Sequence, residues 1–243
     1  MNISSNSNIQ IRLVWLTAFV IAMGFLETSV VVYMRELLYP HGFAFPLAPI
    51  NNKLATIEIL REAATLIMLI AVGMIMGRTR TEKFALFLYG FGIWDVFYYI
   101  FLKLLINWPD SLQTWDILFL IPVTWTSPVL APLMSSLSMV ILSLCVIYLT
   151  NLDLTIFISR LEWILLSTGA CFQFIAFIWD YSQFILSHYS FGRIWSIQSR
   201  DVLYSLSIQY IPKSFNWGIF LVGEFLLLIS IYLFCRRNFR KSV

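Results

Sequence analysis

The chain has 243 residues, of which 60% are hydrophobic and only 12% are charged. Soluble globular domains carry about 25% charged residues, so this composition excludes an ordinary soluble domain and indicates a membrane protein. The net charge of +3 is small and no basic stripe is interleaved with aromatic residues, so nucleic acid is not an expected partner.

Six apolar runs follow one another along the chain, each long enough to cross a hydrocarbon core of about 30 Å as a helix. The alternation of apolar and polar residues that barrel strands require is absent. We therefore predict an all-α fold, a polytopic membrane helical bundle in a lipid bilayer, with 1–243 as a single domain. The predicted spans are 13–34, 57–76, 84–106, 133–150, 163–186 and 215–235.

The distribution of basic residues predicts the orientation of these spans. Arg12 precedes the first span, Arg78, Arg80 and Lys83 lie in the short 77–83 connection, and four basic residues follow the last span. Basic residues accumulate on the cytoplasmic side, so we predict cytoplasmic N- and C-termini in the cell membrane. The longer connections 35–56, 107–132 and 187–214 are then outer loops, although Arg35, Arg193, Arg200 and Lys213 weaken the contrast.

Two outer segments have an unusual composition. Residues 112–132 (LQTWDILFLIPVTWTSPVLAP) are mostly apolar but contain Pro122, Pro128 and Pro132. Proline interrupts a helix, so two interpretations fit: a segment that re-enters the membrane, or an interfacial helix followed by an extended lead into the fourth span. Residues 35–49 are irregular and either cover the outer mouth of a polar site or form a packed loop. Residues 187–214 are expected on the outer surface.

Charged residues within the predicted spans are the main functional signal. A charge at the bilayer centre costs at least about 2.5 kcal/mol on insertion scales, so such groups are expected to face the bundle interior. The acids are Glu27, Glu62, Asp95, Asp180 and Glu224, and the cations are Arg61 and Lys103. Because the acids outnumber the cations, we expect Asp95 or Glu224 to be protonated near neutral pH, or a cation to bind.

Helical spacing places some of these charges on common faces. Glu58, Arg61, Glu62 and Thr65 lie on one face of the second span, and Arg61 is expected to pair with Glu62 and with a carboxylate such as Glu27 or Asp95. Three interpretations of Arg61 fit: a structural ion-pair network, a functional polar pocket, or snorkelling to the interface.

Similar spacing occurs in the third and fifth spans. Asp95, Tyr99 and Lys103 follow one another at four-residue steps, and tyrosine hydroxyls there are expected to satisfy Asp95. Gln173 and Asp180 share a face, and Gly169 would let another helix approach closely.

The outer loop adds one more acid to the candidate site. Asp116 lies beside Trp115 and near Trp108 and Trp125, an arrangement that fits either an interfacial aromatic belt or a platform for a head group. The full set of polar-site candidates is Glu27, Glu58, Arg61, Glu62, Asp95, Tyr99, Lys103, Asp116, Asp180 and Glu224.

Several familiar chemistries have no motif in this chain. His41 and His188 are expected in outer loops, and the three cysteines share no metal-ligand or redox spacing, so no metal site is predicted. The cofactor, if any, stays undetermined.

Three functions remain open. The first is binding, and translocation, of a small solute or cation. The second is an intramembrane enzyme acting on a lipid, with Glu27, Glu62, Asp95 and Asp116 as acid–base groups and Arg61 binding an anionic head group. The third is a non-catalytic subunit with homo-oligomeric or other membrane partners.

Overall fold

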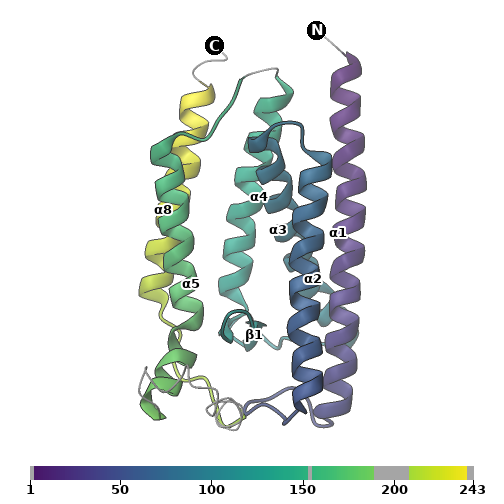
Figure 1. Ribbon diagram of the computed structural model, residues 1–243, viewed down its shortest axis with the longest axis vertical. Helices are drawn as coiled ribbons and strands as arrows, with labels where there is room; N and C mark the ends of the chain where they lie inside the picture. Colours follow the sequence, from purple (N-terminus) through teal and green to yellow (C-terminus); the bar gives the residue numbers. More distant parts are fainter. Residues whose placement is uncertain (1–2, 153–154, 189–207, 240–243) are drawn as a thin grey trace.

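The computed structural model describes residues 3–152, 155–188 and 208–239. This part of the chain contains six long helices and one small sheet (Figure 1). The helices are α1 (Ile3–Leu38), α2 (Asn52–Met76), α3 (Arg80–Ile106), α4 (Leu130–Asn151), α5 (Arg160–His188) and α8 (Trp217–Phe239). All six are long and apolar enough to cross a membrane, which confirms the predicted all-α membrane bundle.

Most of the helices extend a few residues beyond the predicted apolar runs. At α2 and α3 the reason is visible at the first turn, where a polar capping residue precedes the apolar part. Asn51 accepts a hydrogen bond from the Leu54 N–H at 2.8 Å, and Thr79 accepts one from the Glu82 N–H at 3.1 Å. Such caps satisfy backbone donors at a helix start and are themselves hydrophilic, so hydropathy alone places the boundary too late.

The outer faces of the helices are apolar. Leu37 and Ile75 are each 82% exposed, and Phe225 is 65% exposed. Water would disfavour so many exposed apolar side chains along six helices, whereas lipid chains accommodate them. The molecule therefore belongs in a lipid bilayer.

The helices pack through close contacts at small residues. α3 packs against α1, α2 and α4, and α8 packs against α5 and α4. A Cβ added at Gly169 of α5 would lie 2.8 Å from the Gly223 carbonyl oxygen of α8, so this crossing requires glycine. The predicted close approach at Gly169 is thus confirmed.

Within the segment 112–132, residues 115–128 form a β-hairpin and α4 begins at Leu130, so the predicted interfacial helix is wrong. Strands β1 (Trp115–Phe119) and β2 (Trp125–Pro128) pair antiparallel, with Trp115 opposite Pro128. Aromatic and β-branched residues favour strands, and the prolines fall in the turn, at the end of β2 and in the first turn of α4, where a missing N–H is tolerated.

The hairpin lies against the membrane-spanning helices. The Phe119 ring centroid is 6.3 Å from that of Trp94 and 6.2 Å from that of Phe91, both near the middle of α3. Non-helical backbone within a membrane is tolerated only where protein covers it, which is the requirement for a re-entrant segment. Strand pairing and contacts with α3 cover part of the hairpin in this way, and its position relative to the membrane stays a prediction.

The first turn of α1 and the last turn of α8 lie at one end of the bundle, here called the terminal end (Figure 1). The connection between α1 and α2 lies at the opposite end, here called the far end. An even number of spans produces this arrangement. The predicted outer segment 187–214 and the basic tail residues Arg240 and Lys241 lie mostly or wholly outside the described residues.

Candidate functional site

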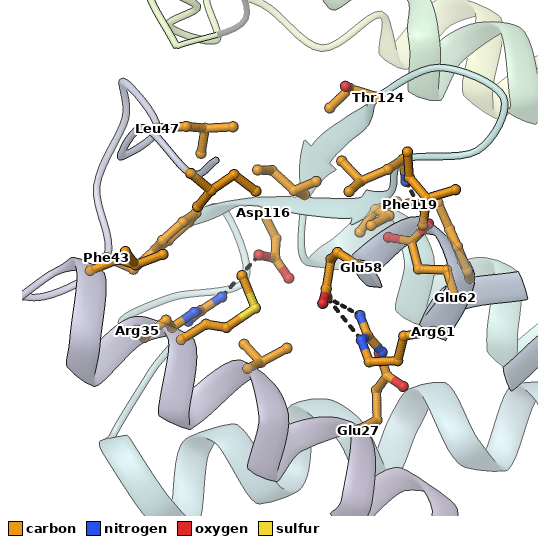
Figure 2. A pocket seen from close by; sticks show the side chains of 18 of the residues that line it. Glu27, Arg35, Phe43, Leu47, Glu58, Arg61, Glu62, Asp116, Phe119 and Thr124 are labelled. Carbon is orange, nitrogen blue, oxygen red and sulfur yellow. Dashed lines mark hydrogen bonds and ion pairs between the residues drawn. The ribbon is translucent and has the colours of Figure 1, made fainter. Parts of the chain in front are cut away.

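A cavity of about 330 Å³ lies between α1, α2, α3, the hairpin and the connection that follows α1. This volume falls at the lower end of the range of about 300–1,000 Å³ that is usual for small-molecule pockets. Its charged lining residues are Glu27, Arg35, Glu58, Arg61, Glu62, Asp95 and Asp116, several of which are shown in Figure 2. Its apolar lining includes Val31, Met34, Leu38, Leu47, Ile50 and Ile59.

Arg61 joins two helices within the cavity. Its Nε donates to Glu58 Oε1 at 2.9 Å, and its guanidinium also forms an ion pair with Glu27 of α1 (Figure 2). The predicted pairing with a carboxylate of another span is therefore present at Glu27. The predicted pairing with Glu62 is wrong, because adjacent residues on a helix do not face one another. Asp95, the alternative to Glu27, bonds to a different helix.

Glu62 instead faces the hairpin. Its Oε2 accepts a hydrogen bond from the Leu120 N–H at 2.8 Å, just beyond β1. The side chain is 6% exposed and lines the cavity. Glu62 thus connects α2 to the hairpin, and it forms no ion pair among the described residues.

A second ion pair lies near the far end of α1. Arg35 Nη2 donates to Asp116 Oδ1 at 3.1 Å, and the guanidinium lies over the rings of Phe43 and Trp108, 4.3 and 3.8 Å from their centroids. Trp108 is only 8% exposed, so this tryptophan does not take part in the interfacial aromatic belt that was one of the two interpretations of the loop. Trp108 instead forms a cation–π contact with the Arg35 guanidinium.

Asp116 is almost completely buried between these groups. Its Oδ2 accepts the Tyr99 hydroxyl at 3.2 Å. Burial raises the pKa of Asp116 above its ordinary value of 3.8, although Arg35, the Ile117 N–H and the Tyr99 hydroxyl all act in the opposite direction.

Asp95 has a different partner from the one predicted. Its Oδ2 accepts a hydrogen bond from Ser136 of α4 at 2.7 Å. Tyr99, which was expected to satisfy it, lies one turn nearer the far end, where its ring packs on Trp108 and its hydroxyl reaches Asp116. Asp95 still lines the cavity.

Three candidates lie away from the cavity. The Lys103 ammonium donates to the carbonyl oxygens of Asn107 and Pro109. Asp180 accepts the Tyr210 hydroxyl at 2.8 Å and two backbone N–H groups that precede α8. Glu224 bonds to Ser138 and Gln173, between α4, α5 and α8. The five acids predicted within spans therefore do not converge on one site: Glu27, Glu62 and Asp95 do, and the other two do not.

Arg35 was not among the predicted site residues. In the sequence it appeared as one of several basic residues that blurred the charge asymmetry, and nothing local linked it to Asp116, which lies 81 positions later. One signal in the sequence could have identified Arg35 as a site residue: a cation at the end of an apolar span needs an anionic partner. The irregular segment after it does line the cavity, through Phe43, Leu47 and Ala48.

The cavity is rich in acidic groups. Five carboxylates and two arginines line it. Arg61 serves two of these carboxylates and Arg35 serves a third, whereas Glu62 and Asp95 form no salt bridge with any described residue. Charged groups interact strongly at such sites because the surrounding dielectric is low. Such a lining attracts cations and supplies strong hydrogen-bond acceptors.

Within the described ranges, no group of three or more His, Cys, Asp and Glu side chains is placed to hold a metal ion. His41 and His188 are both exposed, and the cysteines at 145, 171 and 235 are free.

The six apolar helices and their lipid-facing surfaces define an integral membrane protein of the polytopic helical class. No family model, curated protein or solved structure matches this chain, so its function has to be argued from the cavity itself.

Proposed function

We propose that this membrane protein binds a small organic cation with an apolar body in the cavity and carries it across the membrane. The observation that supports this proposal is the combination of an acid-rich lining with an apolar wall. We further propose that the cavity faces the outside of the cell membrane, with both termini in the cytoplasm.

Glu62 and Asp95 are the groups we assign to the cationic end of the ligand. Each accepts a hydrogen bond from a neutral donor, the Leu120 N–H or the Ser136 hydroxyl, which fixes the position of its carboxyl group. A primary ammonium group carries three N–H donors and forms short, strong hydrogen bonds to carboxylates. Such a ligand would balance part of the acid excess in the cavity.

The apolar wall is the reason to prefer an organic cation. Val31, Met34 and Ile59 offer carbon surface to a ligand. Burial of apolar ligand surface contributes roughly 25 cal/mol per Å². A bare metal ion would gain nothing from these side chains.

Binding can be measured with octylamine and protein in lipid nanodiscs, with empty nanodiscs as the reference for partitioning. We expect Glu62→Gln and Asp95→Asn each to weaken binding by about tenfold or more, or ~1.4 kcal/mol, because each removes a charge-assisted hydrogen bond. Asp110→Asn is the matched control, since Asp110 is an exposed acid at the far end. Equal affinity in all four proteins would refute the proposal.

Translocation needs a separate measurement. Proteoliposomes that carry the protein should accumulate labelled octylamine against empty liposomes, and the Glu62→Gln protein should not. Binding without uptake would restrict the function to recognition.

The two other functions receive less support. In the lipid-enzyme hypothesis Arg61 binds an anionic head group, but here it is already bonded to Glu27 and Glu58. Lipid analysis of a deletion strain tests that hypothesis. The subunit hypothesis requires a stable partner that co-purifies.

A further inference from the structure

We infer that Arg35 forms a second subsite in the same cavity, which takes an anionic oxygen of the ligand. The ligand would then be a zwitterion: an ammonium group at one end, a carboxylate or similar oxyanion at the other, and an aliphatic spacer between them. This inference rests on the proposed function, because it adds a second contact to the ligand proposed there.

The first observation is an unused donor on Arg35. The residue lines the cavity and is only 8% exposed. Its Nη2 donates to Asp116, whereas its buried Nη1 has no hydrogen-bond partner among the described residues. Leaving a buried donor unsatisfied costs about 1–3 kcal/mol, and more for a charged group. A ligand oxygen at Nη1 would remove that penalty.

The second observation is that the guanidinium is held rigidly. Phe43 and Trp108 cover it as aromatic walls, and Asp116 holds one edge. Arginine presents its donors in a fixed planar fork, so the position of Nη1 is determined before any ligand arrives. Rigid groups lose little conformational entropy on binding, which makes this donor favourable for recognition.

A second unused donor lies deeper in the cavity. Trp94 is 5% exposed, lines the cavity, and its buried Nε1 also has no partner in the described part of the chain. The indole N–H can only donate. A ligand that carried an ammonium group alone would leave Arg35 Nη1 unsatisfied, whereas one that also carried an acceptor oxygen at that end would satisfy it.

The positions along the helices set the length of the ligand. α1 and α2 reach similar levels at the far end in Figure 1. Arg35 lies in the last turn of α1, and Glu62 lies nearly three turns inside α2, so Glu62 is roughly 10 Å deeper at 1.5 Å per residue. Val31 and Ile59 line the cavity between these levels. The spacer would contact them.

Three ligands of equal chain length test the inference: octylamine, octanoate and ω-aminooctanoate. The probe is calorimetric binding to the full-length protein in nanodiscs. We expect ω-aminooctanoate to bind about tenfold more tightly than octylamine, or ~1.4 kcal/mol, through the added charge-assisted contact at Arg35. We expect Arg35→Gln to abolish this difference, measured as the ratio of the two affinities in the same variant.

The matched control is Arg12→Gln. Arg12 is also paired with a buried carboxylate, that of Glu82, and also has a buried Nη1 without a hydrogen-bond partner among the described residues, but it lies outside the cavity. This variant should keep the full preference for the zwitterion. Arg35→Lys, which retains the charge but not the planar fork, should keep only part of it.

Each outcome has a distinct meaning. If octylamine binds and ω-aminooctanoate binds no more tightly, the Arg35 subsite is refuted and the proposed cation site survives. The same holds if the preference survives Arg35→Gln. If neither amine binds the wild-type protein, both proposals fail. If Arg35→Gln does not fold, the preference for ω-aminooctanoate over octylamine is compared between the wild-type protein and Arg35→Lys. An undiminished preference in Arg35→Lys would then refute the Arg35 subsite.

Discussion

At the scale of single residues, Arg61 forms ion pairs with carboxylates of two helices that line the cavity, α1 and α2. Glu58 and Glu27 share one guanidinium, and all three side chains are mostly removed from solvent. Removing one member of a buried ion pair leaves an uncompensated charge, which is far more harmful than losing a surface pair. This makes Arg61 a sensitive position for stability.

We expect Arg61→Met to lower the free energy of unfolding by about 3 kcal/mol, because Glu27 and Glu58 would face each other without a cation. Chemical unfolding in mixed micelles measures this. Adding Glu58→Gln to the Arg61→Met protein should restore part of the loss, since it removes one of the repelling charges. Lys103→Met is the control, because Lys103 is exposed and bonds to backbone carbonyls. A fully stable Arg61→Met protein would show that the ion pairs contribute little.

Asp116 predicts a pH dependence of stability. Its pKa is raised in the folded protein because it is buried, so the folded state binds this proton more tightly than the unfolded state. The contribution of the protonated Asp116 carboxyl to the stability of the fold is therefore fully present below pH 3.8, the ordinary pKa of an aspartate. That contribution is lost as the pH rises through the pKa of Asp116 in the folded protein.

The measurement is the apparent melting temperature as a function of pH. On acidification from neutral pH, the wild-type protein should gain stability, or lose less of it, relative to Asp116→Asn. Asp110→Asn, an exposed neighbour, should follow the wild-type curve. Parallel curves for wild type and Asp116→Asn would contradict the prediction.

At the scale of helices and strands, the crossing of α5 and α8 depends on two facing glycines. A Cβ on Gly223 would lie 2.7 Å from the Gly169 carbonyl oxygen, and the reverse distance is 2.8 Å. Both contacts are with backbone atoms, so no side-chain rotation can relieve them. The two helices would have to separate to admit a methyl group.

We expect Gly169→Ala to destabilise the protein by about 1–3 kcal/mol, the usual effect of overpacking. Gly218→Ala on α8 is the matched control, since its Cβ would meet only Asn216 Oδ1 at 3.5 Å. Thermal unfolding in detergent compares the two. Similar melting temperatures for both variants would mean that the crossing adjusts at no cost.

The six helices could be predicted from the sequence, whereas the hairpin could not. Hydropathy over about 20 residues reports burial in lipid directly, and the lipid supplies no competing hydrogen bonds. Residues 112–132 are equally apolar, but their structure depends on partners elsewhere, such as Glu62 of α2 and Trp94 of α3. A local pattern contains no information about those partners.

The same limit applied to the candidate site. Helical spacing correctly grouped Glu58 with Arg61, because both lie on one helix. It could not show that Glu27 faces them, that Glu224 does not, or that Arg35 meets Asp116. Contacts between helices depend on rotation and crossing angle, which one sequence does not specify.

At the scale of the whole molecule, the structure sharpens the charge asymmetry on which the orientation rests. Arg35 weakened the contrast in the sequence, but it is buried and paired with Asp116 at the far end. The exposed cations of the terminal end include Arg78, Arg80 and Arg160. Since the positive-inside rule concerns cations near the membrane surface, a buried, neutralised arginine should not count against it.

We therefore predict that the terminal end is cytoplasmic and the far end faces outward. Two exposed, uncharged positions report the two sides: Ala44 in the connection after α1, and Thr155 between α4 and α5. In a protein whose own cysteines are replaced by serine, a membrane-impermeant maleimide should label Ala44→Cys in intact cells and Thr155→Cys only after permeabilisation. The inverse pattern would place the acid-rich cavity on the cytoplasmic side, and its ligand would then have to be a cation of the cell interior.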